Sequence, residues 1–259
     1  MASTCVVTAT DRNYFVGTEV MLRSLDANYH GENKLEVYVL VPRKQQEWDF
    51  HSTEFKNINV TLIYDPVFES EDAVAAAQSM YDKSRLNSTS MFRFWLGDLL
   101  KKYSKAVYID CDTVIMRDIQ PLLDFEPVGA LAAYNEGQLN LQSNPSFKDA
   151  AYFNSGVMVA NLKTWRVLQV SKKALKIAKE FKDWTGATDQ DVLNIIFRHN
   201  WTPLPMSYNY MVNVFPDVEL QDPLVVHWAG KAKPWLSNSR NDTWKNTWRH
   251  YKNLGPTTM

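Results

Sequence analysis

Ala106-Val107-Tyr108-Ile109-Asp110-Cys111-Asp112 is the stretch that decides the fold of this chain. Its first four residues form an apolar run, which indicates a buried strand. Because side chains alternate across a strand, Asp110 and Asp112 should share one face while Cys111 takes the other. Neighbouring carboxylates repel each other unless a cation lies between them. For an isolated Asp-x-Asp a solvated strand end is the simpler explanation, so a metal site needs support from elsewhere in the chain.

Strands and helices alternate in the residues before this stretch. Apolar runs predict strands at residues 5–10, 35–41 and 60–64, with helices through Met21, Leu22, Leu25 and Tyr29 and through Trp48 and Phe55. Thr18 is expected to cap the first helix. This β-α-β-α-β order predicts a parallel sheet covered by helices on both faces. Ligands of such sheets bind at the carboxyl ends of the strands, which places the residues after the first strand on the same rim as the two aspartates.

The rest of the chain continues the α/β pattern. Hydrophobic periodicity predicts helices at 92–99, 170–181 and 189–197 and strands at 129–134, 152–159 and 224–228. Thr188 should cap the helix at 189–197, and acids in its first turn suit the helix dipole without any functional role. Residues 65–88 and 135–148 are polar and are expected to form long loops, and residues 203–209 to be irregular.

His227 closes the strand at 224–228 and precedes a loop with one glycine and two lysines. A lone histidine at a strand end is more often structural than a metal ligand. Here it matches the position of the two aspartates, and two carboxylates with one imidazole suit manganese better than zinc, with magnesium as the alternative. The open positions of such an ion can take substrate phosphates, which Gly230 would let approach the backbone and Lys233 would contact as a point charge.

Composition narrows the function classes. The 28 basic and 29 acidic side chains give a net charge of −1, which does not indicate a nucleic-acid partner. The two cysteines lie in or beside apolar runs rather than in a disulfide framework, so the expected compartment is reducing and cytoplasmic. Residues 1–20 lack the apolar core of a signal peptide, and no apolar run is long enough to span a bilayer.

Residues 240–253 carry Trp244, Trp248 and Tyr251 at helical spacing, with basic residues between them. Such a stripe is expected to pack back on its own domain. The alternative is an interfacial helix that gives peripheral contact with a membrane bearing a lipid-linked acceptor.

The sequence resembles glycosyltransferase family 8, the retaining group that includes glycogenin and bacterial lipopolysaccharide galactosyl- and glucosyltransferases. The resemblance covers nearly the whole chain. It rests on Thr-Ala-Thr-Asp-Arg-Asn-Tyr at 8–14, the Ser-rich helix start with Arg93, Tyr-Ile-Asp-Cys-Asp at 108–112, Phe-Asn-Ser-Gly-Val at 153–157, Asp-Gln-Asp at 189–191, Leu-Pro-Met-Ser-Tyr-Asn at 204–209 and His-Trp-Ala-Gly-Lys-Ala-Lys-Pro-Trp at 227–235. These pieces occur together and in the family's order.

The resemblance implies a GT-A fold. This is a single α/β, Rossmann-like domain whose central, mixed and mostly parallel sheet is flanked by helices. It would span residues 1–259, with a nucleotide-binding half at about 1–115, a sugar and acceptor half at about 116–236 and a C-terminal extension at 237–259. The donor would be a UDP-sugar and the cofactor Mn²⁺.

The resemblance also assigns residues to parts of this donor. The metal ligands would be Asp110, Asp112 and His227. Uracil and ribose would meet Thr8, Thr10, Asp11 and Tyr14, with Cys111 also among the donor-binding residues. The diphosphate would be held by Gly230 and Lys233, and the sugar by Arg93, Asn154, Asp189 and Gln190. Asp189 and Gln190 are the catalytic candidates, and Asp189 has a positioning role first and a nucleophilic role second.

The activity this implies is transfer of a hexose, glucose or galactose, with retention of configuration. The acceptor would be a glycan, a glycolipid or a protein. One alternative is a glycogenin-like chain that glucosylates its own tyrosine, which implies a homodimer. Further alternatives are a UDP-sugar hydrolase and a binding module without turnover. A metal phosphoesterase is disfavoured because too few ligands are present for a second metal.

Overall fold

The computed structural model describes residues 4–42, 55–64, 88–137, 147, 151–180, 188–237 and 242–254. Most of the predicted loops at 65–88 and 135–148, and the predicted helix through Trp48, lie outside the described residues. The chain divides into two compact units. Unit 1 comprises residues 1–4, 65–108 and 126–204, and unit 2 comprises residues 5–64, 109–125 and 205–259.

Within the described residues, seven strands form a mixed sheet. Their order is β3 (Ile58–Tyr64), β2 (Leu35–Val41), β1 (Thr4–Ala9), β4 (Lys105–Ile109), β7 (Phe153–Asn161), β6 (Leu131–Asn135) and β8 (Trp201–Leu204). The pairs β1–β2, β2–β3 and β6–β8 are parallel, whereas β6–β7 is antiparallel. Helices flank the sheet, so the predicted α/β class with a mixed sheet is confirmed.

Unit 2 begins with the parallel strands β1, β2 and β3, which lie where the apolar runs predicted them. Val6 pairs with Val37 and Ala9 with Leu40, and Thr10 N–H then donates to the Leu40 carbonyl at 3.0 Å. The central positions of both strands are fully buried. Near-continuous valine-rich runs of this kind occur in parallel strands that are covered on both faces.

A second, three-stranded sheet lies in unit 2. Its order is β5 (Thr113–Ile115), β10 (Val225–His227) and β9 (Tyr210–Met211). β10 runs antiparallel to β5, with His227 opposite Thr113, and parallel to β9, with His227 opposite Met211. Sequence analysis predicted β10 but missed β5 and β9, because two or three residues are too few to show a strand period.

Helix α1 (Phe15–Asn28) follows β1 through a short 3-10 turn, Arg12–Tyr14. The prediction that Thr18 caps this helix is wrong. Asp11 caps the preceding turn instead, accepting hydrogen bonds from Asn13 N–H at 2.7 Å and Tyr14 N–H at 3.3 Å. The turn leads straight into the helix, so Thr18 lies one turn inside α1 and its hydroxyl donates to Thr10 Oγ1 at 2.6 Å.

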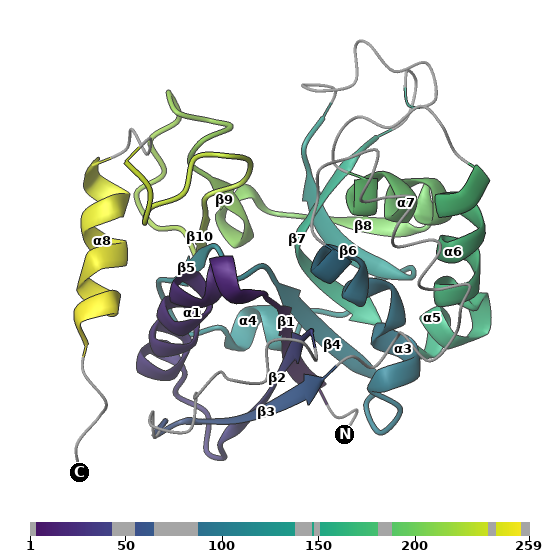
Figure 1. Ribbon diagram of the computed structural model, residues 1–259, viewed down its shortest axis with the longest axis horizontal. Helices are drawn as coiled ribbons and strands as arrows, with labels where there is room; N and C mark the ends of the chain where they lie inside the picture. The colour runs from purple at the N-terminus through teal and green to yellow at the C-terminus, as the bar shows by residue number, and fades with distance from the viewer. Residues whose placement is uncertain are drawn as a thin grey trace. The chain divides into compact units, whose positions relative to one another are not determined.

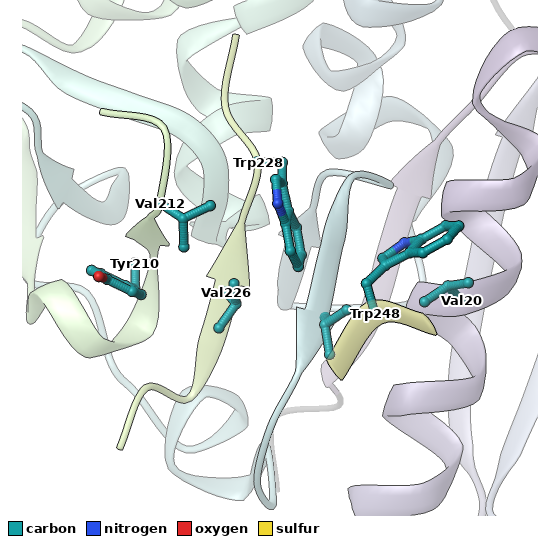
Figure 2. Packing of buried hydrophobic residues seen from close by; sticks show 7 residues of the cluster. Val20, Tyr210, Val212, Val226, Trp228 and Trp248 are labelled. Carbon is teal, nitrogen blue, oxygen red and sulfur yellow. The ribbon is translucent and has the colours of Figure 1, made fainter. Parts of the chain in front are cut away.

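Helix α8 (Asp242–Asn253) packs along α1 in unit 2 (Figure 1). Figure 2 shows Trp248 of α8 beside Val20 of α1, and Trp248 is only 2% exposed. Trp248 belongs to one apolar cluster with Val226 and Trp228, and Trp244 packs edge-on against Tyr210 at 5.9 Å between ring centroids. The expectation that the C-terminal aromatic stripe packs back on its own domain is therefore confirmed.

Unit 1 holds β6, β7 and β8 together with α3 (Leu96–Leu99), α5 (Leu162–Leu168), α6 (Val170–Glu180) and α7 (Thr188–Phe197). The helices α5 and α7 pack against β7, and α6 packs against α7 (Figure 1). The predicted helix at 92–99 begins instead as a 3-10 helix, Ser88–Trp95, and becomes α-helical only at Leu96.

The prediction of irregular chain at 203–209 is wrong, because β8 extends to Leu204 and a 3-10 helix occupies Met206–Tyr208. Sequence analysis missed β8 because Pro203 argues against a strand. Proline removes a backbone donor and is tolerated on an edge strand, and β8 is the last strand of its sheet. Among the described helices, none combines the length and apolar character needed to cross a bilayer.

Candidate functional site

The two aspartates and the histidine predicted as metal ligands meet in unit 2. One ligand atom from each of Asp110, Asp112 and His227 lies within 4.8 Å of the others. His227 Nε2 is 3.4 Å from Asp112 Oδ1 and 3.9 Å from Asp110 Oδ2. Strand β4 ends at Ile109, so the aspartates lie in the bend before β5 and not in the strand. The bend, in which Thr113 Oγ1 donates to the Asp110 carbonyl at 2.8 Å, brings the two carboxylates toward His227.

The other nitrogen of His227 determines how the ring faces the carboxylates. Nδ1 lies 2.9 Å from Oδ1 of Asn209, an oxygen that can only accept a hydrogen bond. Nδ1 therefore carries a proton, and Nε2 is the ring nitrogen that faces the two carboxylates. A divalent cation bound there would take Nε2 and the two carboxylates as ligands. The donor set, two carboxylate oxygens and one imidazole, fits an octahedral divalent ion.

Lys233 supplies the positive charge nearest to this group. Its ammonium donates to Asp112 Oδ2 and, at 2.9 Å, to the Trp228 carbonyl. Burial raises the pKa of Asp112, but attraction to the Lys233 ammonium outweighs this effect and holds the pKa well below its usual range. Burial lowers the pKa of Lys233, but the Asp112 charge outweighs that effect and leaves it raised. Both groups are therefore ionised at neutral pH.

The loop between His227 and Lys233 contains Gly230 in a left-handed backbone conformation. Gly230 has φ +84°, and a Cβ built there would meet nothing within 4 Å. Asn213 fixes the loop by donating to the carbonyls of Ala229 at 3.2 Å and Ala232 at 2.7 Å. A positive φ favours glycine, and a residue without a side chain leaves room for an anionic ligand to approach the loop backbone.

The predicted nucleotide-binding residues follow β1. Asp11 is 3% exposed, and burial raises its pKa despite the two backbone N–H groups that lower it. Thr8 Oγ1 is buried and has no hydrogen-bond partner among the described residues. The Tyr14 ring lies edge-on to Trp235 at 5.6 Å and at the same distance from Lys233 Nζ. Tyr14 therefore joins the end of β1 to the Lys233 loop.

Cys111 is packed into unit 2 rather than presented as a reactive group. It is 7% exposed, and burial, with smaller contributions from Asp112 and Asp110, raises its pKa far above the ordinary value. Its carbonyl lies against α1, where a Cβ built on Gly17 would come within 2.7 Å of it. Cys111 is consequently a neutral thiol that spaces the two aspartates.

Four predicted sugar-binding residues lie in unit 1. Arg93 Nε is 3.2 Å from Asp189 Oδ2, and both side chains are almost fully buried. Arg93 also donates through Nη1 to the Ser155 carbonyl at 3.0 Å and its hydroxyl at 2.8 Å, and its guanidinium lies 4.5 Å over the Tyr108 ring. The arginine is thus a buried group held by several partners, and not a solvated surface side chain.

Asn154 and Gln190 meet at one carboxylate. Gln190 Nε2 donates to Glu136 Oε2 at 3.1 Å, and Asn154 Nδ2 donates to the same oxygen at 3.4 Å. The register of β6 and β7 explains the meeting, because Ala133 pairs with Met158 but Tyr134 with Asn154. The residues between form a bulge, and bulges re-aim side chains at the edge of regular pairing.

Sequence analysis missed Asn209, Asn213 and Glu136 as site residues. Asn209 closes the Leu-Pro-Met-Ser-Tyr-Asn motif, which was quoted without a role for the asparagine. Nothing local marks Asn213 or Glu136, because their partners are distant in sequence. Of the residues predicted, unit 2 brings together Asp110, Cys111, Asp112, His227, Gly230, Lys233, Thr8, Thr10, Asp11 and Tyr14, and unit 1 brings together Arg93, Asn154, Asp189 and Gln190.

Solved structures share this fold. The galactosyltransferase LgtC, crystallised with donor and acceptor sugar analogues, matches with a TM-score of 0.74 at 19% identity, over 99% of this chain and 97% of LgtC. The glycosyltransferase GlyE of Streptococcus pneumoniae matches with a TM-score of 0.71 at 21% identity, over 98% of this chain and 62% of GlyE. These likenesses show that the chain has the GT-A fold of those glycosyltransferases.

Sequence comparison identifies the family. The family model described as Glycosyl transferase family 8 matches residues 5–239, and the chain belongs to this family. General stress protein A of Bacillus subtilis is 26% identical over 271 residues, covering 95% of this chain and 92% of the relative. Glycosyltransferase GlyA of Streptococcus pneumoniae is 25% identical over 251 residues, and the chain spans 34% of its length. A lipopolysaccharide 1,2-glucosyltransferase of Escherichia coli is 27% identical over 253 residues, covering 87% of this chain and 71% of the relative.

The recognition of family 8 from sequence motifs is thereby confirmed. Family 8 glycosyltransferases of the GT-A fold use a nucleotide-sugar donor and a divalent metal. The group formed by Asp110, Asp112 and His227 is the one in the described residues whose donor set suits that metal.

Proposed function

We propose that the protein transfers a hexose, glucose or galactose, from a UDP-sugar to a glycan, lipid-linked or protein acceptor, with retention of configuration and with Mn²⁺ as the metal. The observation that carries the proposal is the convergence of Asp110, Asp112 and His227, with the His227 ring oriented by its hydrogen bond to Asn209. Oxygen-rich ligation with a single histidine favours manganese, with magnesium as the alternative.

Mn²⁺ bound there would neutralise negative charge that develops on the departing diphosphate. Lys233 contributes a second positive charge, because its raised pKa keeps it protonated at neutral pH. Gly230 lets the loop backbone approach the phosphates. Thr8, Thr10, Asp11 and Tyr14 contact uracil and ribose in this proposal. The orphan hydroxyl of Thr8 supports that role, since a buried polar atom without a partner gains a hydrogen bond from a ligand.

The residues of unit 1 act on the hexose in this proposal. As the bond from C1 to the phosphate oxygen breaks, its electron pair leaves with UDP and C1 becomes oxocarbenium-like. The acceptor hydroxyl then bonds to C1 and its proton passes to the departing phosphate. The first role of Asp189, which pairs with Arg93, is to position the sugar. Its second role is that of a candidate nucleophile on the face of the sugar opposite the leaving group. Arg93, Asn154 and Gln190 hold the sugar hydroxyls.

The test is incubation with a panel of UDP-sugars and Mn²⁺, scored by released UDP and by product analysis. A new glycoside supports transfer, and a product that retains the α configuration of the donor supports retention. Free sugar without a glycoside would favour a hydrolase, and no turnover of any UDP-sugar with any acceptor would favour a binding module. Added hexose mass on the protein itself would favour the glycogenin-like alternative.

A matched pair of variants connects activity to the metal group. Asp112→Asn removes a ligand charge, whereas Asp217→Asn removes a charge from the exposed loop that follows β9. Loss of turnover in the first and retention in the second is the expected result. Full wild-type activity in excess chelator would overturn the metal dependence and with it the central support for this function.

A further inference from the structure

Glu136 is a buried carboxylate of unit 1 that the proposed function does not use. It follows β6 directly and is 6% exposed. Its Oε2 accepts two hydrogen bonds, from Gln190 Nε2 at 3.1 Å and from Asn154 Nδ2 at 3.4 Å. One carboxylate oxygen is thus bonded to two of the four residues assigned to the sugar.

The oxygens of the same two amides are bonded to backbone. Gln190 Oε1 accepts from Ser155 N–H at 2.9 Å, and Asn154 Oδ1 accepts from Gly156 N–H at 3.0 Å. An amide group can be turned either way round, because its two ends are alike in shape and differ only in hydrogen-bonding character. Here each amide has its oxygen on a backbone donor and its nitrogen on Glu136, so both ends specify the same orientation.

We propose that Glu136 is a positioning residue that fixes the polarity of the Gln190 and Asn154 amides. In this arrangement both side chains present N–H groups to a hexose, and the amide oxygen of Gln190 is engaged by Ser155. A carboxylate can only accept, so Glu136 excludes the reversed orientation of both amides at once. The inference rests on the proposed function, since it concerns how the residues assigned to the sugar are held.

One consequence concerns the chemistry at C1. Because the Gln190 oxygen accepts from Ser155 N–H, one of its two lone pairs is already engaged by the backbone of β7. Of the two catalytic candidates, this favours Asp189 over Gln190 as the nucleophile. Gln190 then serves as a hydrogen-bond donor whose direction Glu136 determines.

The first arm of the test uses thermal stability and needs no donor. Gln190→Glu places a second carboxylate about 3 Å from Glu136, and two carboxylates that close cannot both ionise. The shared proton then has a raised folded-state pKa, so the related stability is present at low pH and is lost as the pH rises. The Tm of this variant should be near that of the wild type at pH 5 and about 3 °C or more below it at pH 8.

Combining Gln190→Glu with Glu136→Gln again places one amide donor opposite one carboxylate acceptor. The double variant should therefore recover most of the Tm that Gln190→Glu loses at pH 8. Of the other titratable groups nearby, Arg93 pairs with Asp189 and Tyr152 bonds to Asp191, and neither pair includes Glu136 or Gln190. Tyr134 adjoins Glu136. Glu180→Gln, on the exposed end of α6, removes one charge from the same unit and is the matched control. If the Tm of the Gln190→Glu variant follows that of the wild type at both pH values, the proposed role of Glu136 is wrong.

The second arm of the test measures binding of the donor, because a purely structural role of Glu136 would not change the affinity for the hexose selectively. With Mn²⁺ present, the Kd for UDP and for UDP-glucose or UDP-galactose is measured for the wild type, Glu136→Met and Glu136→Gln. Glu136→Met, which removes the acceptor, should leave the Kd for UDP unchanged and raise that for the UDP-hexose about tenfold. Glu136→Gln keeps an acceptor oxygen and should bind the UDP-hexose nearly as the wild type does.

The outcomes separate this inference from the proposed function. If Glu136→Met binds the UDP-hexose as tightly as the wild type, or if Glu136→Gln weakens binding as much as Glu136→Met, the positioning role is wrong. If the wild type binds neither UDP nor a UDP-hexose, the proposed function is wrong. The thermal arm still decides in that case whether Glu136 holds the two amides.

Discussion

Asn209 and His227 form a hydrogen-bonded pair in which Asn209 Oδ1 lies 2.9 Å from His227 Nδ1. Asn209 is fully buried and His227 is 3% exposed, so neither side chain exchanges this bond for water. The bond determines the tautomer of the ring and therefore the side on which a metal finds a lone pair. Partners of this kind are as much part of a metal site as the ligands themselves.

Asn209→Ala should weaken metal binding without removing a ligand. Loss of such a partner costs about 10- to 100-fold in metal affinity, because the ring is no longer held in the binding tautomer. The measurement is the Mn²⁺ concentration that gives half-maximal UDP release. Asn246→Ala, on the exposed face of α8, serves as the control. An unchanged Mn²⁺ requirement in Asn209→Ala would show that the bond does not orient the ligand.

His227→Ala should abolish turnover of the UDP-sugar while the fold survives. The side chain supplies the single imidazole of the metal group, but β10 keeps its backbone pairing with β5 and β9 whatever the side chain. Far-ultraviolet circular dichroism and UDP release measured on the same preparation check both parts. Substantial activity in a folded His227→Ala protein would contradict its role as a ligand.

Asp189→Asn tests the two roles proposed for that carboxylate. The substitution keeps the shape of the side chain but removes the charge that pairs with Arg93. We expect kcat to fall by about 100-fold or more, because positioning and nucleophilic roles both need the carboxylate. Steady-state kinetics with the best UDP-sugar is the measurement. A variant that keeps most of the wild-type kcat would eliminate both roles.

Trp248→Ala should strongly destabilise the protein. Trp248 is 2% exposed within the apolar cluster between α1 and α8, so truncation leaves a large cavity (Figure 2). Removing a buried tryptophan of this kind costs about 3–5 kcal/mol. Urea unfolding followed by fluorescence measures the change, with Arg249→Ala on the exposed face as control. A loss below about 1 kcal/mol would mean that α8 is not an integral part of the core.

Asp11→Asn should become more stable relative to the wild type as the pH rises. Burial raises the folded-state pKa of Asp11, so its stabilising effect is present below the unfolded pKa and is lost as the pH rises through the folded pKa. Asparagine keeps the oxygen that accepts from Asn13 and Tyr14 but carries no buried charge. The difference in Tm between variant and wild type should therefore increase in favour of the variant from pH 3.5 to 7. A difference that is constant or falls would contradict the burial argument.

Local sequence was sufficient for several elements of the fold. The strand at 35–41 was predicted with its observed bounds, because a run of seven largely apolar residues closed by a proline has one simple explanation. The strand ending before Asp110 and the helix at 170–180 followed from the same periodicity. The family motifs then predicted the metal group, and its carboxylates and imidazole, which come from two segments more than a hundred residues apart, were found together.

Elements whose stability comes from distant partners were not predicted. β5 and β9 are two or three residues long and exist because β10 lies between them. β8 contains a proline and is a strand because it pairs with β6 at the edge of the sheet. Asp11 caps the 3-10 turn, and this turn runs directly into α1. Thr18 therefore lies inside the helix and not at its N-cap.

The sequence by itself determined the family and the α/β class and named the three candidate metal ligands, because these depend on residue types and spacings that are local. The tertiary structure alone decided which atoms face each other. It gave His227 its tautomer through Asn209, joined Lys233 to Asp112, and brought Glu136 to the amides of Asn154 and Gln190. Hydrogen bonds between side chains have directions and lengths that only the folded backbone fixes, and no spacing along the chain records them.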